Sequence, residues 1–515
     1  MKKIPTATSS FKNIIEEGYL YIDKTQSIYS LVTNDDYYFL SRPRRFGKSL
    51  LISTLEELFL GNKELFKGLW IHSSNYDWPK HPVITLDFSA LRNESAEKLE
   101  QSLASRIDLK AHELDIDVSS FSDPGDKLEW LVKKLAEKNK VVILIDEYDY
   151  PVLSTINNLE LAQANLKVMS SFFTVIKALN RFIRTVVITG VSQFSKANVF
   201  SGLNNLNDIS LDPIAATLLG YTEQEITTYF SSYIKELAAV KNRPAEEIQK
   251  DMRTWYNGYR FSKITDKVYN PFSVHFLFKK KEFANYWFKS GIPTFLVNLL
   301  AKENYSLKNI EQSEFSINTL ESFALDKLPL VATLFQTGFL TIQDYNEKKR
   351  SYTLNFPNFE VKESFTLYLF SAFSKANLAD IERLLPNLQE ALMYTDMEKF
   401  CITLQTLFAH IPYQIHINQE AYYHSLFQLL VIMLGYESQS ELTTNKDIDL
   451  VITTKNHIYI FEIKLKGTPA AALKQIQKRG YSERFALSGK KITVVGIAFN
   501  PLQGKLGISC ASKTL

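Results

Sequence analysis

Two short polar motifs that follow apolar segments are the most informative feature of this 515-residue chain. The first is Arg42-Pro-Arg-Arg-Phe-Gly-Lys-Ser49, which precedes an amphipathic stretch at Leu50–Leu60. The second is Asp146-Glu147, which ends the apolar run Val141–Ile145. A nucleoside triphosphate needs backbone N–H groups at a helix N-terminus, a lysine for its terminal phosphates, and a hydroxyl and a carboxylate for Mg²⁺. The two motifs contain all of these groups in the required order.

The residue types in the two motifs divide the work of binding and hydrolysing such a nucleotide. Lys48 would neutralise the β- and γ-phosphates, and Ser49 and Asp146 would hold Mg²⁺. Glu147 would polarise the attacking water. The residues predicted to contact the nucleotide or its metal are Arg44, Arg45, Phe46, Gly47, Lys48, Ser49, Asp146 and, after a later strand, Ser192.

Arg44 and Arg45 lie inside the predicted phosphate loop and allow three interpretations. They contact the nucleotide of the same subunit, they act on the site of a neighbouring subunit, or they only solvate the loop. The second interpretation requires a homo-oligomer, which the sequence does not establish.

Each motif also has an interpretation as ordinary structure. Two further Gly-Lys pairs, Gly489-Lys490 and Gly504-Lys505, have no phosphate-loop context, and Arg42 replaces the first glycine of G-x-x-x-x-G-K-[ST]. A plain strand–turn–helix and a strand that ends in solvent would explain the two motifs separately. Their occurrence together, with room for a strand at Val83–Phe88 between them, favours nucleotide binding.

Short apolar runs alternate with helical stretches from Lys2 to about Asp212. This alternation predicts an α/β fold, a parallel sheet with helices on both faces, whose ligands bind outside the carboxyl ends of the strands. Strands are predicted at Tyr38–Ser41, Val83–Phe88, Val141–Ile145 and Thr185–Thr189, and helices at Leu50–Leu60, Ala96–Leu109, Lys127–Glu137 and Leu161–Arg181. Thr189, Ser192 or Gln193 would sense the γ-phosphate or would simply cap the next segment.

The middle of the chain becomes helical and rich in aromatic residues from Thr222 onward, and most of these aromatics are predicted to be core. Two strand-like runs, Gly338–Gln343 and Ser351–Asn355, predict a hairpin. Ala376–Phe408 is predicted to form two helices, the second beginning at Pro386. These patterns divide the chain into residues 1–212, a helical and winged-helix-like middle region at 213–400, and residues 401–515.

Composition limits the classes of partner and the cellular location. The formal charge of +3 gives no overall signature of nucleic-acid binding, so a basic surface must be local. The two cysteines, Cys401 and Cys510, are far apart in the sequence, which argues against a disulfide scaffold or a cysteine-based metal site and fits a reducing compartment. No signal-peptide core follows Lys3, and the longest apolar run, Leu426–Leu434, is too short to span a bilayer. A cytoplasmic protein without a membrane partner is therefore expected.

A second group of charged residues lies near the C-terminus. Glu462 and Lys464 alternate with apolar residues in a predicted strand, so both side chains lie on the same face. Asp449 in the adjoining strand and Glu420 at the start of a helix would supply further carboxylates. Two or three carboxylates and a lysine suit a Mg²⁺-dependent phosphodiesterase, in which Glu420, Asp449 and Glu462 bind metal and Asp449, Glu462 and Lys464 are catalytic. The alternative is a solvated ion pair that protects an edge strand.

These motifs resemble the bacterial AAA-ATPase-like family, whose members carry the same R-P-R-R-F-G-K loop, so Arg42 is no departure from it. The resemblance extends to the segments Tyr21-Ile-Asp-Lys-Thr25, Leu144-Ile-Asp-Glu-Tyr-Asp149, Thr189-Gly-Val-Ser192, Phe200-Ser-Gly-Leu-Asn-Asn205 and Trp255–Phe261. The C-terminal part resembles the PD-(D/E)XK nuclease-like domain often fused to these ATPases, with Gln475 at the polar position of the following helix. Family members usually have Gly-Arg where this chain has Lys446-Asp447. The resemblance implies a P-loop ATPase sheet and a restriction-endonuclease-like α/β domain in a prokaryotic protein.

Two functions are compatible with these features. The first is an ATP-binding and ATP-hydrolysing enzyme coupled to a Mg²⁺-dependent nuclease that acts on DNA or RNA. The second is a nucleotide-controlled switch that recognises a partner through an inactive nuclease-like domain, which the near-neutral charge favours. A purely structural scaffold would require both charged groups to be coincidental.

Overall fold

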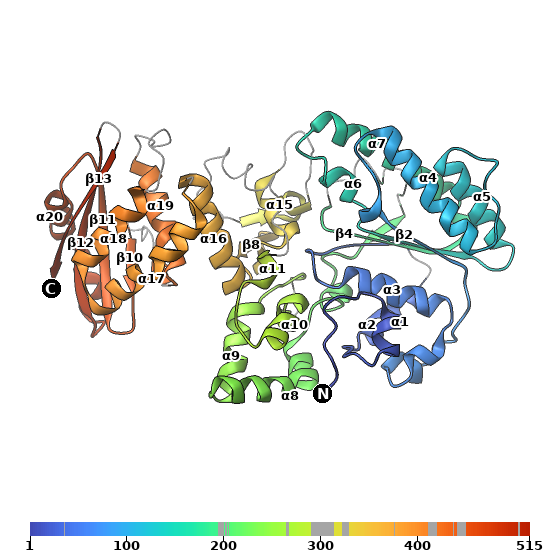
Figure 1. Cartoon of the computed structure of the whole chain (residues 1–515), viewed down its shortest axis with the longest axis horizontal. Coiled ribbons are helices and arrows are strands. Elements are labelled where there is room, and N and C mark those ends of the chain that lie inside the picture. Colours follow the sequence, from blue (N-terminus) through green and yellow to red (C-terminus); the bar gives the residue numbers. More distant parts are fainter. Residues whose placement is uncertain are drawn as a thin grey trace. The chain divides into compact units, whose positions relative to one another are not determined.

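The computed structural model describes residues 1–34, 37–193, 200, 203, 205–263, 267–289, 314–321, 329–374, 376–409, 420–435, 437–439, 450–502 and 505–515. These residues form two compact units: the first comprises the described residues up to Val361, and the second those from Lys362 onward (Figure 1). The expected division at residues 212 and 400 remains a prediction. No helix among the described residues is long and apolar enough to cross a membrane.

The first unit contains a five-stranded sheet with the strand order β2-β3-β4-β1-β5, in which all neighbouring strands are parallel. The strands are β1 (Tyr37–Ser41), β2 (Val83–Asp87), β3 (Val141–Asp146), β4 (Ile183–Gly190) and β5 (Leu206–Asp208). Because β4 lies between β1 and β3, the carboxyl ends of these three strands are adjacent at one edge of the sheet. Both chemical motifs follow strands at that edge.

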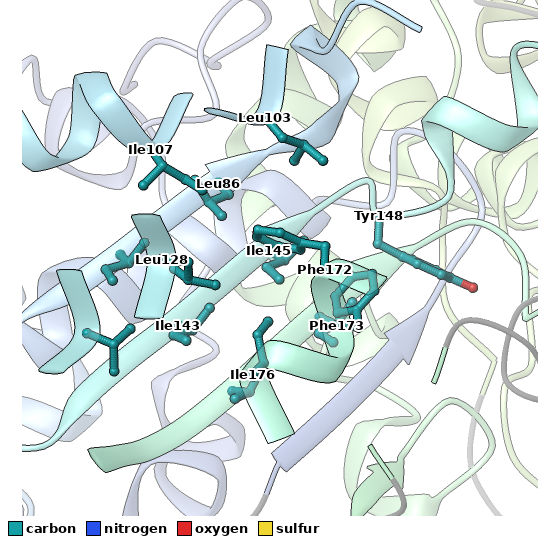
Figure 2. Close-up of a cluster of buried hydrophobic side chains, with 14 of the residues drawn as sticks. Leu86, Leu103, Ile107, Leu128, Ile143, Ile145, Tyr148, Phe172, Phe173 and Ile176 are labelled. Carbon is teal, nitrogen blue, oxygen red and sulfur yellow. The ribbon is translucent and has the colours of Figure 1, made fainter. Parts of the chain in front are cut away.

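Helices cover the sheet and bury its apolar side chains. They are α3 (Lys48–Phe59), α4 (Ala96–Glu113), α5 (Pro124–Ala136), α6 (Tyr150–Leu153) and α7 (Leu159–Ala178). Figure 2 shows Ile143 and Ile145 of β3 beside Leu128 of α5 and Phe172 of α7, all fully or nearly fully buried in one cluster. This core fixes β3 and therefore the position of the carboxylates at its end.

The parallel sheet and its four main helices confirm the prediction from the sequence. The structure adds elements that the pattern did not indicate: α1 (Phe11–Glu16), α2 (Thr25–Thr33), β5, α6 and short 3-10 helices at Lys63–Phe66, Trp70–Ser73, Phe88–Ala90, Asn180–Phe182, Pro213–Ala215 and Tyr481–Phe485. Most of these elements are too short for a helical or strand periodicity to stand out in the sequence.

A helical layer with its own aromatic core follows the sheet in the first unit. It contains α8 (Glu223–Lys241), α9 (Ala245–Tyr256), α10 (Pro271–Lys280) and α11 (Tyr286–Lys289). A capping box between Thr222 and Glu225 begins α8. The rings of Phe230 and Phe278 stack with centroids 5.4 Å apart, which connects α8 to α10. The expectation that most aromatics of this region are core is confirmed.

The predicted hairpin is also present in the first unit. β7 (Thr341–Asn346) and β8 (Ser351–Asn355) pair antiparallel, and β6 (Glu314–Ser316) joins β8 to complete a three-stranded sheet. The helices α14 (Ile317–Glu321) and α15 (Leu330–Thr337) precede the hairpin.

The second unit has a five-stranded mixed sheet with the order β13-β12-β11-β10-β9. Its strands are β9 (Glu437–Gln439), β10 (Leu450–Thr453), β11 (His457–Leu465), β12 (Lys491–Leu502) and β13 (Lys505–Thr514). The helix α20 (Pro469–Arg479) forms the parallel crossover from β11 to β12. The other helices are α16 (Phe359–Ser374), which begins in the first unit, α17 (Leu378–Tyr394), α18 (Met397–Ala409) and α19 (Glu420–Met433).

Alternation along β11 assigns its side chains to two opposite layers. Ile458 and Ile460 form a core with Ile476 of α20. Phe461 instead contacts Phe400 of α18 and Phe427 of α19, with ring centroids 5.8 Å and 5.2 Å apart. The sheet of the second unit therefore has α20 on one face and α18 and α19 on the opposite face (Figure 1).

The prediction that a new helix begins at Pro386 is wrong. Pro386 lies inside α17, and this helix ends only at its C-cap Thr395, which has a φ of 60°. A proline inside a helix removes one backbone hydrogen bond. Buried Leu384 and Leu388 on either side of Pro386 keep the helix packed through this position.

The expectation that the two cysteines form no disulfide framework is also wrong. Cys401 of α18 and Cys510 of β13 form a disulfide, with their Cα atoms 6.0 Å apart. The two cysteines meet because α18 packs directly on β13. Their separation of 109 residues in the sequence gives no sign of this contact. In the same contact, Gln405 Nε2 donates to Ile508 O at 2.6 Å.

Glu360, in the first turn of α16, joins three elements of the first unit. Its Oε1 accepts from the backbone N–H of Trp287 at 2.6 Å, and its Oε2 accepts from the Ser273 hydroxyl at 2.7 Å. The side chain is almost completely buried, and burial raises the pKa of this carboxyl to about 7 despite these hydrogen bonds.

Replacement of Glu360 by glutamine is expected to remove a pH dependence from the stability of the first unit. Because the pKa of Glu360 is raised on folding, protonation stabilises the folded state. This contribution is complete below about pH 4.5 and is lost as the pH rises through about 7. A glutamine amide can accept from Trp287 and donate to Ser273, as a protonated carboxyl would.

All five tryptophans lie in the first unit, so denaturant unfolding followed by tryptophan fluorescence reports on that unit. Between about pH 5 and about pH 7.5 the free energy of unfolding should fall further in the wild type than in Glu360→Gln. Glu347→Gln, at an exposed turn position, is the control and should behave as the wild type. An equal fall in all three proteins would contradict a raised pKa at Glu360.

Candidate nucleotide site and second acidic site

The loop between β1 and α3 has the geometry of an anion-binding turn. Gly47 is the N-cap of α3 and has a φ of 95°, a conformation that glycine adopts without strain. A Cβ atom at Gly47 would meet nothing within 4 Å, so the backbone conformation, not a lack of room, requires the glycine. The first hydrogen bond of α3 runs from Leu51 N to Gly47 O. The N–H groups of the preceding turn therefore lack helical partners and can face an anion.

Arg42 fastens this loop to the sheet rather than to a ligand. Its guanidinium is buried and donates to the backbone oxygens of Ser41, Ser210 and Ala215 at 2.7–2.8 Å. It also lies 4.2 Å from the ring centroid of Phe261. Burial lowers the pKa of Arg42 to about 9, and nearby Asp208 opposes this shift. Arg42 has a negative φ, so the position does not need the glycine of the common motif.

Lys48 places an ammonium group at the base of the loop. The side chain is 4% exposed, and its Nζ donates to Arg42 O at 3.0 Å and to Pro43 O at 3.1 Å. Burial lowers the pKa of Lys48, and the carboxylates of Asp146, Glu147 and Asp149 counteract that shift. The lysine from the first motif and the carboxylates of the second thus belong to one electrostatic cluster.

Asp146 and Glu147 leave the end of β3 in different environments. Asp146 is buried, and its Oδ1 accepts from the Thr189 hydroxyl and from the Glu147 N–H. Glu147 is partly buried and has a φ of 50°, which directs the chain out of the strand direction. Burial raises the pKa of Glu147, and Lys48 is the largest opposing influence. A carboxylate with a raised pKa is a stronger base than an exposed one.

Asp149 completes the cluster and accepts hydrogen bonds from Ser192. The Oδ2 of Asp149 accepts from the Ser192 hydroxyl at 2.8 Å, from Ser192 N at 2.7 Å and from Val191 N at 2.9 Å. Burial raises the pKa of Asp149 in spite of these bonds. The role of Ser192 as a nucleotide contact remains a prediction, and in this structure its hydroxyl orients Asp149.

A cavity of about 470 Å³ lies against the phosphate loop. Arg44, Arg45 and Phe46 line it together with Lys48, Ser49 and Glu147. Its other walls come from the N-terminal segment, from the turn before α8 and from α10. Tyr21 and Lys24, from a segment that carries the family resemblance, also line it, and wall residues without a predicted role are Tyr221, Phe272 and His275.

Contacts with the helical layer hold the loop in place. The indole N–H of Trp287 donates to Arg44 O at 2.9 Å. The Arg45 guanidinium lies 5.2 Å from the centroid of Phe272, while the buried ring of Phe46 meets Tyr259 edge-on at 4.7 Å. Phe46 is therefore part of the support of the loop, whereas Arg44 and Arg45 are exposed beside the cavity.

Histidine in the cavity wall is held as a neutral ring. His275 Nδ1 lies 2.9 Å from Pro5 O and its Nε2 lies 2.8 Å from the Tyr221 hydroxyl. Since the carbonyl can only accept, the proton resides on Nδ1 and Tyr221 donates to Nε2. Burial lowers the pKa of His275 to about 4. The His275 side chain therefore contributes no positive charge to the cavity at neutral pH.

The donor set at the loop fits Mg²⁺. Ser49 supplies a hydroxyl at the start of α3. Within the described residues, both hydrogen bonds of the Asp146 carboxylate are accepted by Oδ1, so Oδ2 is available to a metal ion. Hydroxyl and carboxylate oxygens, completed by phosphate oxygens and water, are the ligands that Mg²⁺ prefers.

The second acidic site lies on β11. Glu462 is fully buried, and Lys464 Nζ donates to its Oε1 at 2.9 Å. Both follow Ile458 and Ile460 in the alternation of the strand, so they lie on the face that α20 covers. Burial of the glutamate excludes the interpretation as a solvated ion pair on an edge strand, because β11 lies between β10 and β12.

The structure describes only some of the other residues predicted for this site. Glu420 is the first residue of α19, but its side chain lies outside the described part of the chain, as does all of Asp449. Gln475 lies on α20, as expected. Within the described residues, no three His, Cys, Asp or Glu side chains come close enough together to hold a metal ion. The metal-binding roles of Glu420, Asp449 and Glu462 therefore remain predictions.

Comparison with known proteins agrees with both halves of this description. Residues 5–200 match the family described as predicted AAA-ATPase, and residues 418–507 match the PD-(D/E)XK nuclease superfamily. A relative from Azotobacter chroococcum mcd 1, named "Uncharacterized protein in vnfD 5'region", is 34% identical over 513 residues, covering 97% of this chain and 96% of the relative. This chain belongs to the AAA-ATPase-like family and carries a C-terminal domain of the PD-(D/E)XK nuclease superfamily.

Proposed function

We propose that the first unit binds and hydrolyses ATP with Mg²⁺ and that the second unit is a Mg²⁺-dependent nuclease. The observation that carries the ATPase proposal is that Lys48 and Glu147 line a cavity beside the phosphate loop, with Asp146 in the same electrostatic cluster. The ammonium of Lys48 is buried, and Glu147, whose pKa is raised by burial, lines the same cavity. These are the groups that phosphoryl transfer to water requires.

The residues of this chain would divide the reaction as follows. The N–H groups at the start of α3 and Lys48 bind the β- and γ-phosphates, and Ser49 and Asp146 would hold Mg²⁺, which neutralises developing charge on the phosphates. Glu147 accepts a proton from the attacking water. Asp149 and Thr189 orient the cluster, because each hydrogen-bonds a residue at the neighbouring strand end.

The nuclease proposal rests on the buried Glu462–Lys464 pair at the C-terminal end of β11. Burial of an ionisable pair is costly, so its retention in an otherwise apolar strand suits a chemical role. Glu462 would bind Mg²⁺ together with Asp449 and Glu420, and Lys464 would stabilise charge on the phosphodiester.

The switch function keeps one specific observation in its favour. The phosphate loop is joined to α16 by two hydrogen bonds in series: Trp287 donates its indole N–H to Arg44 O and its backbone N–H to Glu360. The helix α16 then continues along the chain into the second unit. A change of loop conformation on nucleotide binding would therefore act on the helix that begins the second unit.

Substitutions at Lys48 and Glu147 are expected to separate binding from hydrolysis. Lys48→Ala removes the cation for the phosphates and should abolish binding of a fluorescent ATP analogue. Glu147→Gln should retain that binding and lower the rate of ATP hydrolysis by about 10²–10⁴-fold, the usual contribution of a general base. Lys138→Ala, which removes an exposed lysine elsewhere in the first unit, is the control. Wild-type hydrolysis in Glu147→Gln would exclude Glu147 as the base.

Wild-type protein is expected to cleave at least one of single- or double-stranded DNA or RNA in Mg²⁺ or Mn²⁺. Glu462→Gln should lose cleavage while ATP hydrolysis stays unchanged, and Lys455→Ala, at the exposed turn before β11, should retain both activities. Gel assays with and without ATP provide the measurement. Absence of cleavage by a wild type that hydrolyses ATP would reject the nuclease and leave the switch.

Loss of the Trp287 indole N–H is expected to uncouple α16 from the nucleotide. In the wild type, ATP should change the hydrogen exchange of the α16 amides. Trp287→Phe keeps an aromatic ring but cannot donate to Arg44 O, so this change should shrink while ATP affinity is retained. Trp130→Phe, on α5, is the matched control. An unchanged response in Trp287→Phe would remove this contact from the coupling.

A further inference from the structure

The charge of the chain is strongly segregated along the sequence. Residues 450–515 contain eleven Lys and Arg residues and only two acidic residues, which gives a formal charge of +9. The remaining 48 basic and 54 acidic residues leave residues 1–449 with a formal charge of −6. The near-neutral total therefore conceals a basic C-terminal segment in the second unit, and clustered basic residues of this kind bind polyanions.

Part of this positive charge lies on the open side of α20. Ala472 and Ile476 are the buried residues of this helix. Lys474 and Lys478, four residues apart, lie on the exposed side and follow each other by about 6 Å along the helix axis. Lys466, in the turn before α20, is exposed as well. Among the described residues, none of these three lysines takes part in a salt bridge or hydrogen bond of its side chain.

The helix that carries these lysines begins beside the second acidic site. Gly496 of β12 is paired with Glu462 in the sheet, and a Cβ atom at Gly496 would lie 2.3 Å from Pro469 O and 3.0 Å from Ala472 Cβ. The first turn of α20 therefore lies directly against the strand next to Glu462. Lys466 follows Lys464 by two residues, and Asn500 Nδ2 donates to Gly467 O at 3.2 Å to hold this turn.

We propose that Lys466, Lys474 and Lys478 form a phosphate track that holds the backbone of a nucleic acid and leads it to Glu462 and Lys464. This inference rests on the proposed nuclease function and names the surface that presents the substrate. Lysines that are not paired with acids recognise phosphates without reading bases, so the track binds without sequence preference and weakens with salt.

The composition of the face favours a nucleic acid over a lipid surface. The apolar residues Ala472 and Ile476 pack on the sheet, and Pro469, Ala470 and Ala471 are the small residues exposed or half-exposed at its start. A helix that lies in a membrane interface needs large apolar side chains on its free face. A row of lysines beside small residues instead permits close approach of a sugar–phosphate backbone.

Binding of labelled duplex DNA and RNA of two unrelated sequences, measured over a range of salt concentrations in EDTA, tests the track. The protein is the full chain carrying Glu462→Gln, so that no substrate is cleaved. The double variant Lys474→Ala/Lys478→Ala is compared with Lys235→Ala/Lys241→Ala, which removes the same charge from exposed positions of α8. Circular dichroism and ATP hydrolysis verify that each variant is folded.

The α20 variant should bind about tenfold more weakly at low salt, and its slope of log affinity against log salt should be smaller by about 2, because two phosphate contacts are lost. The α8 variant should match its parent. Equal effects of the two double variants, or no effect of either, would overturn the track. Binding of anionic vesicles but not of nucleic acid would also overturn it. Salt-dependent nucleic-acid binding that needs α20, in a wild type that cleaves nothing, would support the track and reject the nuclease.

Discussion

The buried ammonium of Lys48 is the constraint on which the first unit depends. A charge at 4% exposure is stable only if neighbouring groups replace the water that it has lost. Two carbonyl oxygens of the loop and three carboxylates at the end of β3 fulfil that requirement. The strand order makes this arrangement possible, because only β4 lies between β1 and β3. The lysine after β1 and the carboxylates after β3 therefore lie at the same edge of the sheet.

Residues of β4 and of the helical layer keep this cluster in position. Thr189 near the end of β4 holds Asp146, and Ser192, two residues beyond the strand, holds Asp149, so neither carboxylate is free to turn away from the loop. The loop itself is fixed from below by Arg42 and from the side by Trp287. In the second unit a buried charge is compensated differently: Glu462 and Lys464 lie on the same strand and form an ion pair.

Sequence patterns over a few neighbouring residues predicted the elements whose structure depends mainly on those neighbours. The loop with Lys48, the strand that ends at Asp146 and the β7–β8 hairpin were all evident, because apolar runs and turn residues report on neighbours in the sequence. The role of Arg42, the cavity wall at His275 and the Cys401–Cys510 disulfide were not evident. Each of these depends on contacts between segments more than a hundred residues apart, to which periodicity is blind.

Pro386 and the first turn of α16 show the limits of reading boundaries from residue type. A proline predicted a break where packing continued the helix. Conversely, the two units meet along the chain with no linker composition at all: Phe359–Val361 belong to the first unit, and the same helix continues into the second. A fragment ended before Phe359 would remove the carboxyl that holds Trp287 and Ser273, and a fragment begun at Lys362 would expose a helix without its first turn. The two units are therefore poor candidates for separation into independently folding modules, or for exchange with unrelated domains, at this junction.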